Sequence, residues 1–501
     1  MKNIQLFING EFKNSSNGKS VESIDSCNGE VIAEVQIPSE SDIEDAVNAA
    51  NTAFYDSEWR DYDVEKRSEI LLKVSELIKE RKRDLIEWEI KDSGSTFSKA
   101  AADVHNSASY FKVLSKSMKN FNFGPTMDER ATREGFSKNY LIHEPVGVCA
   151  QIIPWNFPLI MAAWKIGPII AAGCTTVLKS AVETPVTAMM LAEILKDAGL
   201  PNGVVNIITG GAKEGEALLQ NKLIKKVAFT GSTEVGKLIM KNASEKMLNT
   251  TLELGGKSPN IILKDADLDI AIDGSLYAFL YHQGQACDSG TRILVHEEIY
   301  DEFKERLLKR IEDIGIGLTS EKSSTYGPMV NEKHMNRVMS YIDKTKEEGA
   351  NLLCGGHRIT EGDYSKGCYI APTVFEITPD NTIWHEEIFG PVAGLTKFKT
   401  TDEAIKLANH SEYGLAAAVW GKDQKEIDKL TRAIEAGTIW VNEYHLLNPG
   451  MPFGGFKMSG IGREMGDKGL MAYLEPKHLW VSDCDSRDKK PWFDMIFKPS
   501  K

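Results

Sequence analysis

The sequence lacks several features that would place it in a specialised class of protein. Its seven cysteines form no Cys-x-x-Cys pair, a pattern that fits neither a zinc site nor a disulfide framework and indicates a reducing compartment. Positive charge is in deficit: the formal net charge is -13, whereas nucleic-acid binding calls for a basic surface. We therefore expect no metal site, no nucleic-acid partner and a cytoplasmic location.

Long hydrophobic runs are also absent. Residues 1–12 contain no apolar run long enough for a signal peptide. The most apolar segment, residues 159–173, is short for a membrane span and is interrupted by Lys165. We predict a buried helix there and no membrane partner. With 501 residues, of which 42% are hydrophobic and 26% charged, the chain is expected to form a globular protein of two or three domains.

Strands and helices are predicted to alternate from residue 148 onward. Short apolar segments at 148–153, 175–178, 204–208 and 227–229 are predicted strands, each followed by a predicted helix. This order is typical of βαβ units in a parallel sheet, whose ligands bind at the carboxyl ends of the strands. Four residues follow these strands and are expected around one site: Asn156, Lys179, Gly211 and Ser232.

The rest of the chain gives further predictions of local structure. A second α/β domain is predicted, with strands at 261–263, 292–295, 392–395 and 416–419 and helices at 268–281, 298–314, 332–348 and 401–409. Near the N-terminus, Asn9-Gly10 predicts a hairpin, residues 41–44 predict a capping box, and helical periodicity runs from 64 to about 119. The polar segment 126–143 is predicted to be a strand pair that leaves the main body.

One cysteine lies in a segment that suggests a reactive site. Cys287 follows Gly284 by three residues in FLYHQGQACDSGTR (279–292), and a glycine lets the backbone and a substrate come close. A freed backbone N–H can then stabilise an oxyanion. The alternative is a structural cysteine, since free cysteines are among the most buried residues. From this segment alone, both interpretations remain open.

Two further segments have the composition of a ligand site. GSTEVGK (231–237) nearly matches a phosphate loop, but Leu238 replaces the hydroxyl residue that reaches Mg²⁺, which excludes a nucleoside triphosphatase. Its turn and helix N-terminus can still bind a pyrophosphate, in a variant manner because G-x-G-x-x-G is absent. Glu253, followed by two glycines, is either a surface carboxylate or part of a crowded site. Asn156 could instead cap a helix, and Lys179 could be solvated.

Six motifs together resemble the aldehyde dehydrogenase superfamily over essentially the whole chain. They are PWNFP (154–158), FTGSTEVG (229–236), LELGGKSPN (252–260), GQAC (284–287), EEIFGPV (386–392) and PFGGFKMSGIGRE (452–464). The resemblance implies an α/β fold with two parallel-sheet domains: a Rossmann-like cofactor-binding domain (1–125 and 146–255) and a catalytic domain (256–470). It also implies a small β oligomerisation element (126–145 and 471–501) and a homo-oligomer, either a dimer or a tetramer.

The resemblance also implies the residues of the site. Cys287 would be the nucleophile, Glu253 the general base, and Asn156, with the backbone N–H of Cys287, the oxyanion hole. The implied cofactor-binding residues are Ile153, Trp155, Lys179, Val182, Gly211, Gly215, Phe229, Gly231, Ser232, Leu254, Glu387 and Phe389. The implied substrate pocket consists of Phe157, Trp164, Tyr281 and Phe453.

The implied reaction oxidises an aldehyde to the carboxylic acid with NAD(P)⁺, through a thiohemiacetal and a thioester on Cys287. Water activated by Glu253 would release the acid. The expected cofactor is NAD. NADP is a second candidate, because Val182 stands where most NAD-preferring members have a ribose-binding Glu. Aromatic pocket residues without an arginine imply neutral aliphatic or aromatic aldehydes, with betaine aldehyde as the alternative.

Other classes within this resemblance are a catalytically silent relative and a coenzyme-A-acylating enzyme. The first would lack Cys287 or Glu253 and the second would tend to lack Glu253, and both residues are present. Two positions depart from the usual motif: His282 replaces an Asn, and Asp288 follows the cysteine. A carboxylate directed at the thiol would raise its pKa, so we expect Asp288 to point away.

Overall fold

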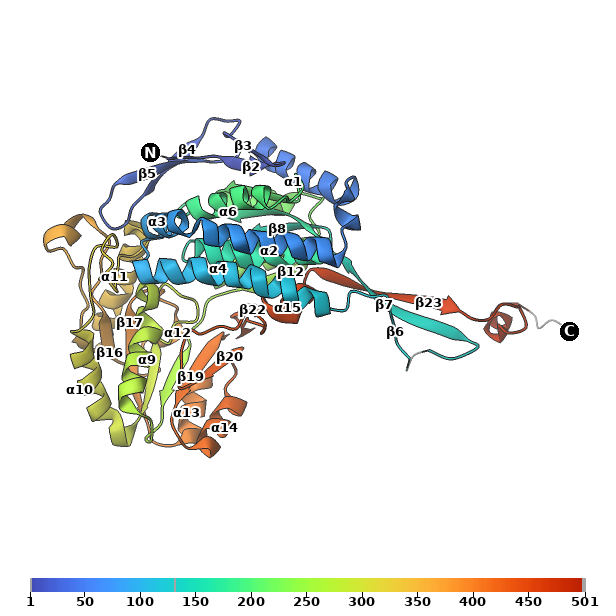
Figure 1. Cartoon of the computed structure of the whole chain (residues 1–501). Coiled ribbons are helices and arrows are strands. Elements are labelled where there is room, and N and C mark those ends of the chain that lie inside the picture. Colours follow the sequence, from blue (N-terminus) through green and yellow to red (C-terminus); the bar gives the residue numbers. More distant parts are fainter. Residues whose placement is uncertain (1, 130–131, 498–501) are drawn as a thin grey trace.

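Two large β-sheets covered by helices form the body of the protein, and a narrow β arm extends from it (Figure 1). The computed structural model describes residues 2–129 and 132–497. None of the helices in these residues is long and apolar enough to cross a membrane. The predicted α/β class with parallel sheets is confirmed.

The first sheet has eight strands in the order β22-β12-β11-β8-β9-β10-β2-β3. The five central strands are parallel: β12 (Asn249–Glu253), β11 (Lys226–Thr230), β8 (Val148–Ile152), β9 (Thr175–Ser180) and β10 (Val205–Thr209). The chain runs outward from β8 to β10 and then returns to β11 on the other side of β8. Ligands of open α/β sheets bind where the strand order reverses in this way.

Antiparallel strands complete both edges of this sheet. At one edge, β2 (Leu6–Ile8) and β3 (Glu11–Lys13) form the predicted hairpin, and its turn residues Asn9 and Gly10 have the positive φ angles, 53° and 79°, of a type I′ turn. At the other edge, β22 (Gly460–Ile461) pairs with β12 at Glu253 and Leu252. The segment around 460 therefore lies beside Glu253, across the predicted domain boundary at 255.

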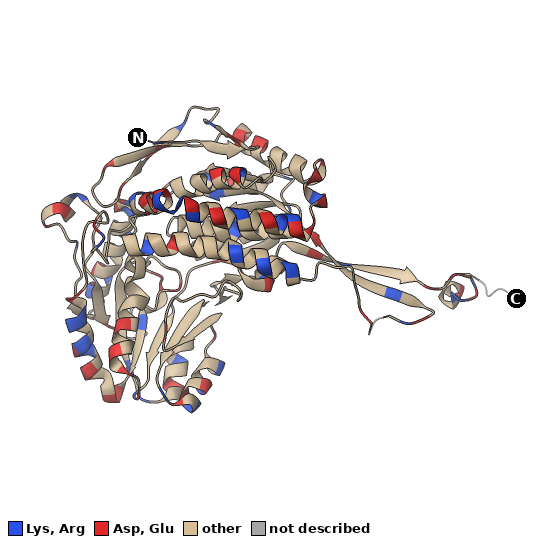
Figure 2. Cartoon of the chain, viewed as in Figure 1, with Lys and Arg blue, Asp and Glu red and all other residues tan. Residues whose placement is uncertain are grey.

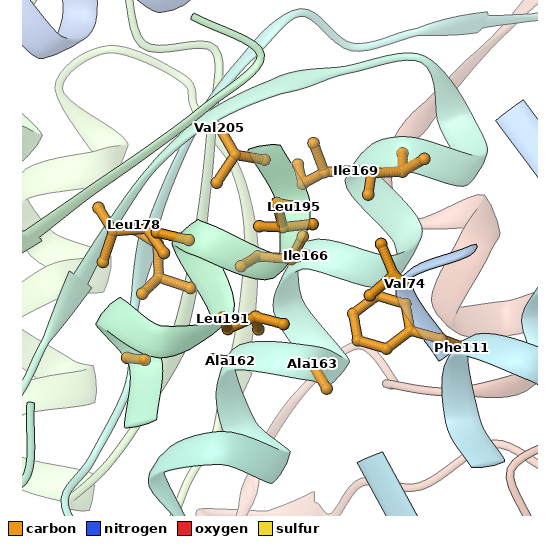
Figure 3. Packing of buried hydrophobic residues seen from close by; sticks show 14 of the residues in the cluster. Val74, Phe111, Ala162, Ala163, Ile166, Ile169, Leu178, Leu191, Leu195 and Val205 are labelled. Atoms are coloured by element: carbon orange, nitrogen blue, oxygen red, sulfur yellow. The ribbon is translucent and has the colours of Figure 1, made fainter. Parts of the chain in front are cut away.

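Helices cover both faces of the first sheet. On one face lie α1, α7 and α8, and on the other α5 and α6, with α2, α3 and α4 packed outside them. Their bounds are α1 (Glu40–Tyr55), α2 (Val64–Glu80), α3 (Lys82–Ser93), α4 (Phe97–Ser117), α5 (Pro158–Ala172), α6 (Val186–Asp197), α7 (Ala212–Gln220) and α8 (Thr233–Ser244). The predicted buried helix is α5. Figure 3 shows its side chains Ile166 and Ile169 in one cluster with Leu195 of α6 and Phe111 of α4.

Three local predictions need correction. The capping box of α1 spans 39–42, because the Asp42 N–H donates to Ser39 Oγ (3.1 Å) and the Asp42 carboxylate accepts from the Ser39 N–H (2.9 Å). The helical segment 64–119 is three helices, with breaks at Arg81 and at Gly94, whose φ is 66°. Asn156 is not the N-cap of α5: Phe157 holds that position without a side-chain cap.

The second sheet has seven strands in the order β15-β16-β17-β14-β13-β19-β20. All are parallel except the edge strand β15, and their bounds are β13 (Pro259–Ile262), β14 (Arg292–His296), β15 (Asn351–Cys354), β16 (Thr373–Glu376), β17 (Val392–Phe398), β19 (Ala416–Trp420) and β20 (Thr438–Val441). One face packs against α9 (Leu268–Leu280) and α10 (Tyr300–Ile311). The other packs against α11 (Glu332–Glu347), α12 (Thr382–His385), α13 (Thr401–Asn409) and α14 (Gln424–Ala433).

The arm is a three-stranded antiparallel sheet that projects from the body (Figure 1). The predicted strand pair is present as β6 (Thr126–Met127) and β7 (Ser137–Pro145), and β23 (Leu474–Ser482) pairs along the whole of β7. Residues 130–131 of the predicted excursion and 498–501 of the predicted tail lie outside the described residues.

Helices of the body carry charged residues of both signs (Figure 2).

Three small elements complete the chain. A sheet at the N-terminus consists of β1 (Lys2–Ile4), β5 (Val31–Gln36) and β4 (Ser20–Ile24). A two-stranded sheet joins β18 (Tyr413–Gly414) to β21 (Phe456–Lys457), and α15 (Gly466–Met471) precedes β23.

Candidate active site

A cavity of about 330 Å³ lies at the strand-order reversal of the first sheet and is closed by segments of the second half. It is lined by the loop after β8, the turn after β11, the end of β12, the Cys287 segment and part of α11. Of the predicted residues it brings together Cys287, Glu253, Asn156, Trp155, Phe157, Gly231, Ser232, Leu254, Glu387 and Phe389. A larger groove of about 1270 Å³ beside α3 and α4 contains none of the predicted residues.

The segment before Cys287 has a strained backbone. His282, Gln283 and Gly284 have φ angles of 51°, 55° and 70°. Left-handed backbone costs a residue other than glycine about 1–3 kcal/mol, so surrounding contacts must hold this segment. The side chain of Gln285 supplies two of them: its Nε2 donates to the His282 carbonyl (3.1 Å) and its Oε1 accepts from the Val330 N–H (2.9 Å). These bonds fix the position of Cys287.

Gly284 allows the approach of a second loop, not of a substrate. A Cβ at this position would lie 2.2 Å from the carbonyl oxygen of Gly390. Gly390 follows Phe389, which also has a left-handed φ of 62°. The two loops that contribute Cys287 and Phe389 to the cavity are thus packed backbone against backbone. The expectation that Gly284 makes room for a substrate is corrected on this point.

Cys287 is a partly buried free thiol. Burial raises the pKa of Cys287 well above its usual value, and the charges of Asp288, Glu387 and Glu253 raise it further. The carboxylate of Asp288 is directed toward His445, with 3.3 Å between Asp288 Oδ2 and His445 Nδ1. This contact agrees with the expectation that Asp288 points away from the thiol, although its charge still raises the pKa of Cys287. These effects favour the protonated form of the thiol.

Glu253, at the end of β12, is buried rather than exposed. Neither of its carboxylate oxygens has a hydrogen-bond partner in the part of the chain that the structure describes. Burial raises the pKa of Glu253 to about 8, and the nearby cations Lys165 and Arg463 oppose this effect. A carboxyl group with such a pKa can both accept and return a proton at physiological pH.

Lys165 of α5 lies behind Glu253, and sequence analysis missed its role. Its ammonium group contacts the Glu464 carboxylate and donates to Thr230 Oγ1 (2.6 Å). Burial lowers the pKa of Lys165 to about 7, against the attraction of Glu253. The lysine in the middle of an apolar helix was the available signal, since buried charges are retained only with partners.

The amide of Asn156 faces the cysteine segment. Its Nδ2 donates to the carbonyl of Gln285 (2.8 Å), two residues before Cys287. An amide nitrogen carries two N–H donors, so the second is available for another acceptor. Asn156 therefore contributes a donor next to the thiol and does not cap a helix.

The turn after β11 suits an anionic ligand. Ser232 is the N-cap residue of α8, where its Oγ accepts from the Val235 N–H (3.4 Å), and the Gly231 N–H donates to the Glu253 carbonyl (3.0 Å). The N-terminus of α8 therefore lines the cavity, and such a terminus favours phosphate groups. On the loop that carries Phe389, Glu387 Oε1 accepts from the Gly256 N–H (3.1 Å).

The remaining predicted cofactor residues lie outside this cavity, in strands β9 and β11, in the segments that follow β8, β9 and β10, and in helix α7: Ile153, Lys179, Val182, Gly211, Gly215 and Phe229. Lys179 is buried, not solvated. Its ammonium group donates to the carbonyls of Ser180 (3.3 Å) and Gly210, and burial lowers the pKa of Lys179 to about 8. Gly215 packs on this side chain, since a Cβ there would lie 3.5 Å from Lys179 Cε.

Two residues of α11 line the cavity without having been predicted. His334 Nε2 lies 2.7 Å from the Phe389 carbonyl oxygen, and its ring centre lies 5.0 Å from that of Trp155. Arg337 donates to the carbonyls of Ile388 (2.9 Å) and Glu387 (3.1 Å). Both residues hold the loop that carries Glu387 and Phe389. They belong to an ordinary amphipathic helix, so no sequence motif marked them.

The four predicted substrate-pocket residues form two aromatic pairs. The ring centres of Phe157 and Tyr281 lie 6.0 Å apart, and those of Trp164 and Phe453 lie 5.7 Å apart. Only Phe157 lines the cavity itself. Tyr281 also contacts the ring of His445, at 5.3 Å.

The fold and the site define a parallel α/β protein in which a thiol, a buried carboxyl group and an amide meet beside a helix N-terminus. The model of the aldehyde dehydrogenase family matches residues 12–479. Human mitochondrial aldehyde dehydrogenase is 42% identical over 486 residues, which are 95% of this chain and 92% of that protein.

Solved structures give the same result. The NAD⁺ complex of an aldehyde dehydrogenase from Bacillus cereus is 41% identical, covers 96% of this chain and 97% of its own, and superposes with a TM-score of 0.92. Betaine aldehyde dehydrogenase from Staphylococcus aureus, also in complex with NAD⁺, is 37% identical, with coverages of 96% and 95% and a TM-score of 0.93. The chain belongs to the aldehyde dehydrogenase family, as its six motifs predicted.

The first prediction concerns the charge behind Glu253. Lys165→Met removes the cation that lowers the pKa of Glu253, so this pKa should rise above about 8. A carboxylate that must be ionised to accept a proton is then ionised only at higher pH. The rising limb of the pH–rate profile should move to higher pH, and the rate at pH 7 should fall severalfold. Arg463→Gln should move it in the same direction, and an unmoved limb in both variants would contradict the prediction.

Proposed function

We propose that this chain oxidises an aldehyde to the carboxylic acid with NAD⁺, and also with NADP⁺, through a thiohemiacetal and a thioester on Cys287. The observation that carries the proposal is the meeting of Cys287, Glu253 and Asn156 in one cavity at the N-terminus of α8. The relatives solved as NAD⁺ complexes support the same cofactor.

The residues around the cavity fit a dinucleotide. The N-terminus of α8, with Gly231 and Ser232, is suited to the pyrophosphate, and Trp155, Leu254, Glu387 and Phe389 would hold the nicotinamide end. Lys179, Val182, Gly211 and Gly215 would face the adenosine ribose. When bound, NAD(P)⁺ accepts a hydride from the substrate.

The residues of the chain supply nucleophilic and proton-transfer chemistry. Cys287 attacks the aldehyde carbon, and the free N–H of Asn156 donates to the oxygen as it becomes negative. Because its surroundings favour the protonated thiol, Cys287 must lose a proton during attack. Glu253, with a pKa of about 8, can accept that proton, release it to solvent, and then accept one from the water that hydrolyses the thioester.

Two alternative activities receive less support. A catalytically silent relative would not keep both Cys287 and Glu253 directed at one cavity. A coenzyme-A-acylating enzyme has no need of a base placed to activate water, and Glu253 is such a base. Assaying the product with and without coenzyme A separates these activities, since acyl-CoA formation would replace formation of the free acid.

We also infer the wider organisation from the predicted domains. Residues 1–125 and 146–255 would form the cofactor-binding domain, 256–470 the catalytic domain, and 126–145 with 471–501 the oligomerisation element. The arm exposes the apolar side chains Leu141, Leu479, Trp480 and Val481, which supports a homo-oligomer, a dimer or a tetramer. The seven cysteines, all free, support a cytoplasmic location.

The second prediction tests the two steps of the reaction. Cys287→Ala should abolish turnover and retain cofactor binding, because only the nucleophile is lost. Glu253→Gln should give a burst of reduced cofactor followed by very slow turnover, because hydrolysis of the thioester lacks its base. Stopped-flow absorbance measures both. Near-normal steady-state oxidation by Cys287→Ala would refute the assignment.

The third prediction concerns the substrate. Phe157 lines the cavity with Cys287 and packs on Tyr281, and these aromatic rings favour neutral aliphatic or aromatic aldehydes. Betaine aldehyde is the alternative, because aromatic faces also attract a trimethylammonium group. One relative is itself a betaine aldehyde dehydrogenase. We expect kcat/KM to be highest for a neutral aldehyde in a panel that includes betaine aldehyde. A higher value for betaine aldehyde than for every neutral substrate would reverse the order.

The fourth prediction concerns the choice of cofactor. Val182 offers no carboxylate to the adenosine ribose and no repulsion to a 2′-phosphate. Val182→Glu should therefore shift the NAD/NADP ratio of kcat/KM toward NAD by on the order of tenfold, which corresponds to about 1.4 kcal/mol. Glu183, whose charge acts on the Lys179 ammonium, is the residue that could compensate in the native chain. An unchanged ratio would show that residue 182 does not face the ribose.

A further inference from the structure

A buried ionic cluster lies beside the loop that carries Asn156. It consists of Glu89 of α3 and Lys99 and Asp103 of α4, whose exposed fractions are 0%, 3% and 1%. Lys99 Nζ lies 2.6 Å from Asp103 Oδ2. Removing three ionisable groups from water is costly, and replacing such groups by apolar residues is often neutral or stabilising. Packing alone therefore does not account for the cluster.

The cluster contacts three of the four residues from 156 to 159. Lys99 Nζ donates to the backbone carbonyl of Asn156 (3.2 Å) and lies 4.2 Å from the ring centre of Phe157. Glu89 Oε1 accepts from the Leu159 N–H (3.2 Å). Helix α5 has no side-chain cap of its own at Phe157, so Glu89 supplies an acceptor to its first turn from another helix.

The two ends of Asn156 are held by different parts of the molecule. Its backbone carbonyl accepts from Lys99, whereas its side-chain Nδ2 donates to Gln285 beside Cys287. A bond on the backbone side fixes the orientation of the peptide group, and this orientation decides where the side chain points. A change in the Lys99 contact therefore moves the amide relative to the thiol.

The cluster is not optimised for stability. Glu89 Oε2 and Asp103 Oδ1 are buried without a hydrogen-bond partner among residues 2–129 and 132–497. The buried ring of His282 lies beside the same loop, 5.4 Å from the ring of Phe157. Unpaired buried polar atoms cost free energy, and natural proteins tolerate them mainly where function requires the arrangement.

We propose that Lys99 is a positioning residue of the oxyanion site, acting through the backbone carbonyl of Asn156. This inference rests on the proposed function, because it assumes that the Asn156 amide stabilises the oxyanion on the substrate. Lys99 does not touch substrate or cofactor in this role. With Asp103 and Glu89 it holds residues 156–159 so that the Asn156 amide faces Cys287 before the substrate arrives.

The test is a double-mutant comparison in the full-length enzyme. Lys99→Met keeps an unbranched side chain that is one heavy atom shorter, and it removes the charge and the donors. It should lower the rate of the burst of reduced cofactor by about 10- to 100-fold, the loss expected from a small misplacement of a catalytic group, with an unchanged KM for NAD. Lys99→Arg, which retains a donor, should recover part of the rate.

The Asn156→Ala background identifies the route of the effect. Asn156→Ala alone should lower the burst rate by about 10²–10³-fold. If Lys99 acts through Asn156, adding Lys99→Met to this variant should change the rate by less than about threefold, because the group it positions is gone. If the two losses multiply, or if Lys99→Met alone leaves the burst rate unchanged, the proposal is overturned.

A matched control separates positioning from general destabilisation. Lys226 is an equally buried lysine on β11, where Nζ donates to Asn249 Oδ1 (2.9 Å) and Thr251 Oγ1 (2.6 Å). Lys226→Met should lower the thermal unfolding temperature and leave the burst rate unchanged. Should Lys99→Met fail to fold, Lys99→Gln and Asp103→Asn are compared with Asn156→Ala in the same way.

Failure of the proposed function has a different signature. It would show as a native enzyme without aldehyde-dependent cofactor reduction, or as a Cys287→Ala variant that retains it, and the Lys99 proposal would then fall with it. If the native enzyme turns over and the Lys99→Met variant has the native burst rate, only the Lys99 proposal is overturned.

Discussion

Buried charged side chains lie at two places along helix α5, one at its N-terminus and one in its middle, and the geometry of the site depends on both. At its N-terminus, Lys99 and Glu89 contact the residues that lead into the first turn. In its middle, Lys165 lies behind Glu253 and opposes the rise that burial causes in the pKa of this carboxyl group. Burying an unpaired charge in such apolar surroundings costs much free energy, so each of these charged side chains needs a partner. Lys99 contacts the Asn156 carbonyl directly, and Glu89 contacts the first turn of the helix that follows.

The loops that line the cavity have strained backbone and are held in place by close packing. Cys287 follows a left-handed run of backbone, and Gly284 in that run contacts the carbonyl of Gly390. Because Phe389 lies next to Gly390, the segment that carries Cys287 and the loop that carries Phe389 cannot move independently. Arg337 and His334 fasten the second loop to α11. The cavity is thus built before any ligand binds, which reduces the cost of ordering it during a reaction.

The electrostatic environment of the cavity is acidic around the thiol. Asp288, Glu387 and Glu253 all raise the pKa of Cys287, and burial raises that of Glu387 to about 7. Such surroundings disfavour an isolated thiolate and favour a cationic group beside it. A nicotinamide ring in its oxidised form carries a positive charge, so the same field that keeps the thiol protonated is consistent with the proposed cofactor.

Much of the fold followed from local signals in the sequence. The hairpin at Asn9-Gly10, the alternation of strands and helices, and the buried helix at 159–173 depend on turn chemistry and on the spacing of apolar residues, which act over a few positions. The six motifs also placed Cys287, Glu253 and Asn156 among the candidate residues. The capping box of α1 lies two residues before its predicted position. Several serines lie near the start of this helix, and only their contacts in the fold decide which of them caps it.

What the tertiary structure decided concerns burial and contacts between distant segments. Burial raises the pKa of Glu253 to about 8, and Lys165 and Arg463, which lie far from it in sequence, oppose this rise. His334 and Arg337 reach the cavity from a helix without a motif, and Lys99 reaches the carbonyl of Asn156 from another helix. The sequence by itself determined which reactive groups this protein has. Their charge states and orientations were decided only by the fold, because desolvation and hydrogen bonding depend on which surfaces meet.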